Sequence, residues 1–237
     1  MMQRQTAALI LLDLTLVIGS AFRQGTIFGA AMSNISGNRI PTGVDTDHEA
    51  VTACQKGDVA AFERLVEKYQ KKMLNIAYRM TGDYDDACEV VQEAFLSAYR
   101  AIRKFRGDAR FSTWLYGIVV NHAKNRLKQV QSRTFREGTS LDDPVETGEG
   151  QYVREPVAQE SLAVEELERK EIREKVQHCI ESLDPEQREV LVLRDIQGFA
   201  YEEIRDILKL PDGTVKSRLF RARDAMKQCL KKALGDL

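Results

Sequence analysis

Two neighbouring stretches decide the fold of this chain: residues 85–95, DDACEVVQEAF, and residues 105–116, FRGDARFSTWLY. In the first stretch, apolar residues up to Phe95 recur at helical spacing behind acidic residues, which the macrodipole favours at the start of a helix. In the second, Gly107 lies in a short break before another apolar helical pattern that includes Trp114. Together they predict two helices with a short Arg- and Gly-containing connection.

Helical periodicity continues on both sides of these stretches. It covers nearly all of residues 47–131 and returns over 167–183, 185–196, 201–208 and 214–233, and no segment alternates in the manner of a strand. We therefore expect an all-α protein. A composition of 43% hydrophobic and 30% charged residues is typical of a soluble globular chain, and 237 residues suffice for two small cores.

A Gly- and Pro-containing segment divides the chain. Residues 137–160 hold three glycines and two prolines with few large apolar residues, which is the composition of a flexible linker. Residues 137–174 hold twelve acidic and four basic residues. We expect two small helical domains, a helical bundle over 47–132 and a helix-turn-helix unit over 165–237, joined by a flexible acidic linker over 133–164.

The N-terminal residues 1–46 differ from the rest. Their apolar run, residues 7–22, is broken by Asp13 and is shorter than the roughly 20 residues that span a bilayer, so we expect no membrane insertion. We expect a disordered extension or a misassigned start, with translation beginning at Met32.

The chain contains four cysteines and three histidines, with no C-x-x-C pair. The pattern predicts no metal site and no cofactor, and indicates ordinary thiols in a reducing cytoplasm. The cysteines are Cys54, Cys88, Cys179 and Cys229.

The C-terminal segments have the spacing of a helix-turn-helix: a short helix over 201–208, a turn over 209–213 and a long helix from Thr214. The long helix carries seven basic residues against the single acid Asp224 before its final turn, which suits a phosphate backbone. A solvated basic helix end is the alternative. The candidate DNA-binding residues are Thr214, Lys216, Ser217, Arg218, Arg221 and Arg223, while Val215, Leu219 and Ala222 share the opposite, buried face.

A second basic concentration lies between residues 100 and 128, interleaved with aromatic residues. Cations follow a phosphate backbone while aromatic faces receive unstacked bases, so this segment is a candidate for holding single-stranded DNA. The alternative, that Phe111 and Trp114 fill the core, stays open.

The quoted stretches, together with YEEI at 201–204 and LPDGTVKSRL at 210–219, resemble regions two and four of the extracytoplasmic-function (ECF, group IV) sigma factors of the sigma-70 family. The resemblance covers about 47–237, apart from the linker. It implies a cytoplasmic, non-enzymatic subunit that binds core RNA polymerase, recognises the −35 and −10 promoter elements, promotes DNA melting and initiates transcription of a stress or envelope regulon.

The resemblance also assigns residues and partners. The largest-subunit clamp helices of polymerase would bind Asp85, Asp86, Glu89, Gln92 and Glu93, and the flap of the second-largest subunit would be a further contact. The −10 element would contact Arg106, Asp108, Arg110, Phe111, Ser112, Thr113, Trp114, Asn121, Asn125 and Arg126. The −35 element would contact the helix from Thr214. An anti-sigma factor, in some cases membrane-bound, is expected, and no small-molecule substrate is.

The sequence departs from the family pattern at two positions. Ala200 stands where a capping Ser or Thr is usual, and Lys209 stands where a turn glycine is usual. A helix-turn-helix regulator with an N-terminal sensor domain is the competing interpretation. An enzyme is not expected, because no nucleophile-base pairing, phosphate-binding glycine loop or metal-ligand cluster appears.

Overall fold

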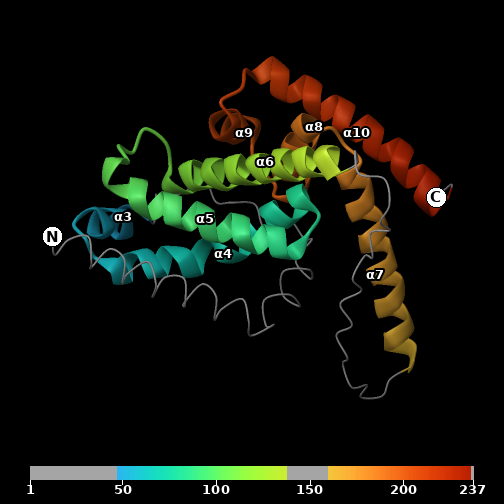
Figure 1. Ribbon diagram of the computed structural model, residues 1–237, viewed down its shortest axis with the longest axis horizontal. Helices are drawn as coiled ribbons and strands as arrows, with labels where there is room; N and C mark the ends of the chain where they lie inside the picture. Colours follow the sequence, from blue (N-terminus) through green and yellow to red (C-terminus); the bar gives the residue numbers. More distant parts are fainter. Residues whose placement is uncertain (1–46, 138–159, 236–237) are drawn as a thin grey trace.

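The structure, a computed structural model, describes residues 47–137 and 160–235, which are helical and contain no strand (Figure 1). This confirms the all-α prediction. The first range holds α3 (His48–Gln55), α4 (Val59–Thr81), α5 (Tyr84–Ala101), the 3₁₀ turn η1 (Ile102–Lys104) and α6 (Phe111–Glu137). The second holds α7 (Glu160–Glu181), α8 (Pro185–Leu191), the π-helical turn η2 (Val192–Ile196), α9 (Tyr201–Leu208) and α10 (Asp212–Leu234).

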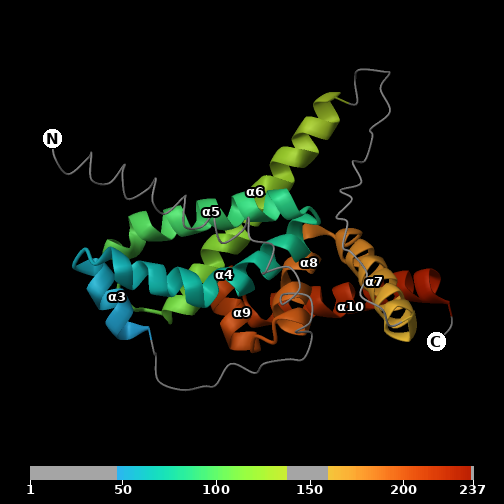
Figure 2. The same ribbon diagram turned by 90° about the horizontal axis from the view of Figure 1, so that it is seen from below.

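Helices α4, α5 and α6 pack side by side as the body of the first unit, and α3 lies against α4 (Figures 1 and 2). Phe62 of α4 meets Phe95 of α5 edge-on, with ring centroids 6.4 Å apart, a favourable geometry for two aromatic quadrupoles. Met73 and Leu115 are fully buried in the same core. The apolar periodicity of the sequence therefore marks the true core face of each helix.

The boundary between α4 and α5 depends on a glycine and a capping carboxylate. Gly82 ends α4 at a φ of 83°, a left-handed conformation that costs glycine little. Asp83 then caps α5, its Oδ1 accepting a hydrogen bond of 2.7 Å from the backbone N–H of Asp86. This places the acidic residues of α5 in its first turns.

Helices α9 and α10 form the predicted helix-turn-helix. The turn between them contains Lys209 at a φ of 56°, so the position where the family usually has a glycine does take a left-handed conformation, which is mildly strained for lysine. Val215, Leu219 and Ala222 of α10 are buried, as predicted.

The two helical units pack against each other and share one hydrophobic core. Tyr116 of α6 meets Phe199, which precedes α9, with ring centroids 5.0 Å apart, and Arg79 of α4 donates a 2.7 Å hydrogen bond to Gln177 of α7. Helix α6 continues through 133–137 and α7 begins at 160, so both margins of the predicted linker are helical. The remaining linker residues and the predicted extension 1–46 lie outside the described residues.

A disulfide joins Cys179 of α7 to Cys229 of α10. The expectation of four thiols is therefore wrong for this pair, while Cys54 and Cys88 are free thiols. The pair is separated by 50 residues, and its formation depends on the packing of α7 beside α10, which no local pattern of the sequence encodes.

The start of α9 lacks half of its cap. The backbone N–H of Ala200 donates a 2.8 Å hydrogen bond to the Glu203 carboxylate, but alanine offers no oxygen to the first-turn N–H groups. We predict that Ala200→Ser raises the free energy of unfolding by about 1 kcal/mol, measured by urea denaturation. Ala60→Ser, at an exposed position within α4, is the control and should lower stability by a few tenths of a kcal/mol. Equal effects of the two substitutions would contradict the capping explanation.

Candidate functional site

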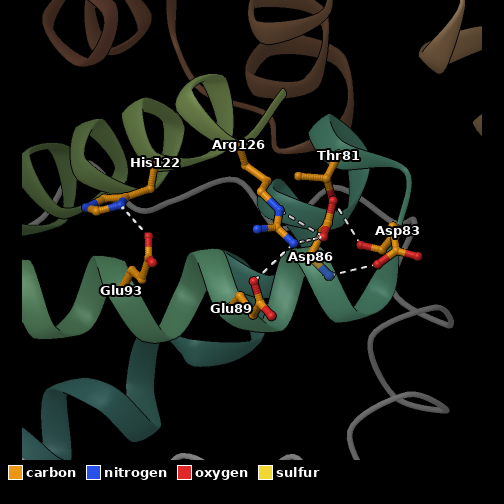
Figure 3. Close-up of polar contacts among 7 residues, drawn as sticks. All are labelled: Thr81, Asp83, Asp86, Glu89, Glu93, His122 and Arg126. Carbon is orange, nitrogen blue, oxygen red and sulfur yellow. Dashed lines mark hydrogen bonds and ion pairs between the residues drawn. The ribbon is translucent and has the colours of Figure 1, made fainter. Parts of the chain in front are cut away.

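The acidic side chains of α5 form a polar cluster with α6 (Figure 3). Arg126 donates a 2.9 Å hydrogen bond from Nε to Asp86 Oδ1, and its Nη2 lies 3.1 Å from Glu89 Oε2. His122 Nδ1 lies 3.3 Å from Glu93 Oε2, and its Nε2 lies 3.0 Å from Ser97 Oγ. Two carboxylates therefore hold this cation, and the hydrogen bond to Asp86 raises the pKa of Arg126.

The five residues predicted to bind polymerase lie on this one helix but differ in exposure. Asp85, Glu89 and Glu93 are exposed, whereas Asp86 and Gln92 are half-buried. Asp86 is committed to Arg126, and Glu89 shares that cation. Asp85 therefore offers the most available negative charge to a partner, and Glu93 is exposed although its carboxylate lies beside His122.

The segment between η1 and α6 presents polar residues above an aromatic cluster. Arg106 and Asp108 are highly exposed, and Nε of Arg106 lies 3.6 Å from Oδ2 of Asp108. Trp114 is half-buried and packs on Phe105 at 5.0 Å between ring centroids. Gln55 anchors this segment from α3, donating a 2.8 Å hydrogen bond to the Phe105 carbonyl; sequence reasoning missed this contact, because nothing local links α3 to residue 105.

Not all of the predicted −10 residues reach the surface. Phe111 is 1% exposed and Thr113 is buried, so both side chains lie in the core of the folded chain, and for Phe111 this is the alternative weighed above. The other members of the set are exposed or half-buried: exposed are Arg106, Asp108, Arg110, Asn121 and Asn125, and half-buried are Ser112, Trp114 and Arg126.

Helix α10 exposes Lys216, Ser217, Arg221 and Arg223, with Thr214 and Arg218 half-buried. Arg223 is held by Asp195 of η2 through two hydrogen bonds of 2.8 and 2.6 Å. Phe220 of the same helix is 76% exposed. The sequence analysis did not name this residue, although its position outside the buried stripe of Val215, Leu219 and Ala222 indicates that it faces solvent.

A buried carboxylate connects the two basic helices. Glu189 of α8 is 1% exposed, with Lys124 Nζ of α6 2.9 Å from its Oε2 and Arg218 Nη1 of α10 3.2 Å from its Oε1. Burial raises the pKa of Glu189, and the hydrogen bond and charge of Lys124 and the charge of Arg218 oppose that shift. Nη2 of Arg218 also lies 2.6 Å from Oε2 of Glu186, and the Arg218 side chain is only 18% exposed.

Residues 47–137 and 160–235 contain no group of three or more His, Cys, Asp or Glu side chains that could hold a metal ion. No helix within the same ranges is long and apolar enough to cross a membrane. What the described surface does offer is acidic residues on one helix and basic residues on two others.

Comparison with known proteins shows what this arrangement belongs to. Family models for Sigma-70 region 2 and Sigma-70, region 4 match residues 65–134 and 173–226. The RNA polymerase sigma-H factor of Pseudomonas aeruginosa is 39% identical over 192 residues, which are 81% of this chain and 97% of that protein. The ECF RNA polymerase sigma-E factor of Escherichia coli is 42% identical over 183 residues, 76% of this chain and 92% of that protein.

The chain belongs to the ECF sigma factor family. It acts in transcription initiation, as the resemblance of its sequence to this family implied. The region 2 match occupies the first helical unit, which rules out the alternative of a sensor domain there. The relatives are sigma factors rather than enzymes.

Solved structures support the fold of this ECF sigma factor. CnrH in complex with the cytosolic domain of CnrY has a TM-score of 0.56 at 24% identity, covering 78% of this chain and 97% of that one. The Bartonella quintana sigma factor RpoE in complex with the anti-sigma factor NepR has a TM-score of 0.53 at 20% identity, covering 72% and 96%. At these identities the likeness shows the fold alone.

Proposed function

We propose that this ECF sigma factor binds core RNA polymerase through the acidic side of α5 and recognises promoter DNA through α10 and the segment from Arg106 to Arg126. The observation that carries the proposal is the separation of charge in the folded chain. Exposed carboxylates lie on α5, whereas exposed cations lie along α10, where they suit a phosphate backbone.

The −35 element is the proposed ligand of α10. In a helix-turn-helix the first turns of the second helix enter the major groove, where Lys216, Ser217 and Arg221 are exposed. Arg218 and Arg223 are tied to carboxylates of α8 and η2, so they position the helix as well as bearing charge. The exposed Phe220 ring suits contact with a thymine methyl group.

The −10 element is the proposed ligand of the first unit. Arg106 and Asp108 are exposed in the segment before α6, Trp114 is half-buried near the start of α6, and Asn121 and Asn125 are exposed further along α6. A base flipped out of the opening duplex would be bound there, its contacts offsetting the few kcal/mol of unstacking. This role requires binding energy and no chemistry.

Further partners are part of the same proposal. The clamp helices of the largest polymerase subunit would meet α5, and the flap of the second-largest subunit would meet the second unit. We propose a cytoplasmic protein serving a stress or envelope regulon and restrained by an anti-sigma factor, a kind of partner present in one of the similar solved structures. Recovery of the protein from unstressed cells only as free or polymerase-bound chain would contradict the anti-sigma partner.

Reconstituted transcription tests the DNA-binding assignment. With core polymerase and a panel of genomic promoter fragments, the protein is expected to produce start sites that are absent without it. Arg221→Glu should reduce these transcripts by roughly tenfold or more, because it replaces an exposed cation with a carboxylate that the phosphates of the DNA repel. Lys232→Glu, in the last turn of the same helix, is the control and should have a small effect. Equal transcription with wild type and Arg221→Glu would contradict the assignment.

Polymerase binding tests the acidic side of α5. Asp85→Lys and Glu93→Lys reverse exposed charges without breaking the Asp86–Arg126 pair, and together should weaken binding to core polymerase by roughly tenfold. The measurement is fluorescence anisotropy of the labelled protein titrated with core enzyme. Glu67→Lys reverses an exposed charge on α4 and should leave affinity nearly unchanged. If all variants bind alike, the interface lies elsewhere.

A further inference from the structure

The disulfide between Cys179 and Cys229 encloses the helix-turn-helix. It joins the C-terminal end of α7 to α10, where the two helices pack together (Figures 1 and 2). The cysteines are 50 residues apart in the sequence, and the chain between them contains α8, η2, α9 and most of α10. A cross-link of this span removes many conformations from the unfolded chain, so it stabilises the segment that it encloses.

The disulfide lies where the packing of α10 weakens. Val215, Leu219 and Ala222 form a buried stripe in the first half of the helix. Met226 and Cys229 continue this stripe at helical spacing, but both are only half-buried. The cross-link therefore fastens the second half of α10 on its packed side, and the exposed cations of the helix lie off that stripe.

The two cysteines differ in exposure. Cys179 is 0% exposed, whereas Cys229 is half-buried, so a small oxidant reaches the Cys229 sulfur first. Their Cα atoms are 5.7 Å apart, and α7 packs against α10 through other residues as well, so the two thiols stay close together when reduced. An accessible cysteine beside a buried resolving one is the arrangement in which a sulfenic acid is converted to a disulfide.

We infer that Cys179 and Cys229 are a reversible redox modification site, at which peroxide forms the disulfide and the disulfide slows unfolding of the helix-turn-helix unit. The inference rests on the proposed function, because a protein that binds promoter DNA works in the cytoplasm. Thiols are kept reduced there, and a disulfide in that compartment is usually transient and redox-sensing.

Hydrogen peroxide is the oxidant for which the chemistry balances. The Cys229 thiolate attacks one peroxide oxygen and breaks the O–O bond, which gives a sulfenic acid and, after protonation, one water. The Cys179 sulfur then displaces the hydroxyl group of the sulfenic acid, which leaves as a second water with the Cys179 proton. The two thiols lose two electrons and two protons in total. A dithiol reductant reverses the modification by thiol–disulfide exchange.

Peptide mass spectrometry of the purified full-length protein tests the site. After treatment with hydrogen peroxide, alkylation in urea should leave Cys179 and Cys229 unlabelled, and the cross-linked peptide that contains both should be recovered. After treatment with dithiothreitol, both should be alkylated. Alkylation of both cysteines after peroxide, with no cross-linked peptide, overturns the inference.

The rate of native-state proteolysis tests the stabilising role. Peroxide-treated protein, freed of reagent, should be cleaved in the second unit at least tenfold more slowly than reduced protein, because the cross-link lowers the population of the opened unit. Cys229→Ser should be cleaved at the rate of the reduced protein with or without peroxide. Cys88→Ser replaces another half-buried cysteine and should keep the full difference. Equal rates for oxidised and reduced wild type, a comparison that needs no variant, overturn the inference, as does a peroxide effect that persists in Cys229→Ser.

Reconstituted transcription separates the redox site from the proposed function. The oxidised and reduced proteins should give the same start sites, because the disulfide lies off the exposed cations of α10. Start sites absent with both forms refute the proposed function, while labelling and proteolysis still decide the redox site. Start sites lost only in the oxidised form overturn the stabilising role of the disulfide.

Discussion

The pairing of buried charges along α8 is the constraint on which the rest of this structure depends. Arg188 satisfies carbonyl groups at the ends of two helices from different units, and Glu189 receives cations from α6 and α10. Either group would be strongly destabilising in the same place without its partners. The short helix α8 therefore fixes where the first unit, α7 and α10 meet, and with them the two basic surfaces.

The charged residues on each of the two proposed binding surfaces fall into two groups. On α5 the half-buried Asp86 holds Arg126, while Asp85 and Glu93 remain exposed to a partner. On α10 Arg223 and Arg218 are held by carboxylates of other elements, the exposed Lys216 is paired with Asp212 of its own helix, and Arg221 is exposed. Each surface thus combines ion pairs that orient its helix with exposed charges that are available for binding, and the small net charge of the chain conceals both.

Local sequence patterns predicted the helices, the helix-turn-helix and its buried stripe, because each depends on residues within a few turns of one another. They could not predict that Phe111 belongs to the core, since the decisive neighbours, such as Tyr69, are distant in sequence. The disulfide and the shared core could not be predicted either, because both join residues that are distant in the sequence. Gly117 can be seen in the sequence as a glycine inside a helix, but only the fold brings it close to α9, where a Cβ atom would lie 3.3 Å from the Ile207 carbonyl oxygen.

The contact between the acidic side of α5 and core polymerase is the part of the proposed function on which promoter recognition depends. A photo-crosslinker at the exposed position 85 of α5 reports that contact directly in the full-length protein. Crosslinks from position 85 to the largest subunit of core polymerase, and none from the exposed position 67 of α4, are the expected result. A transcribing complex without crosslinks from position 85, or with equal crosslinks from both positions, would contradict the proposed interface.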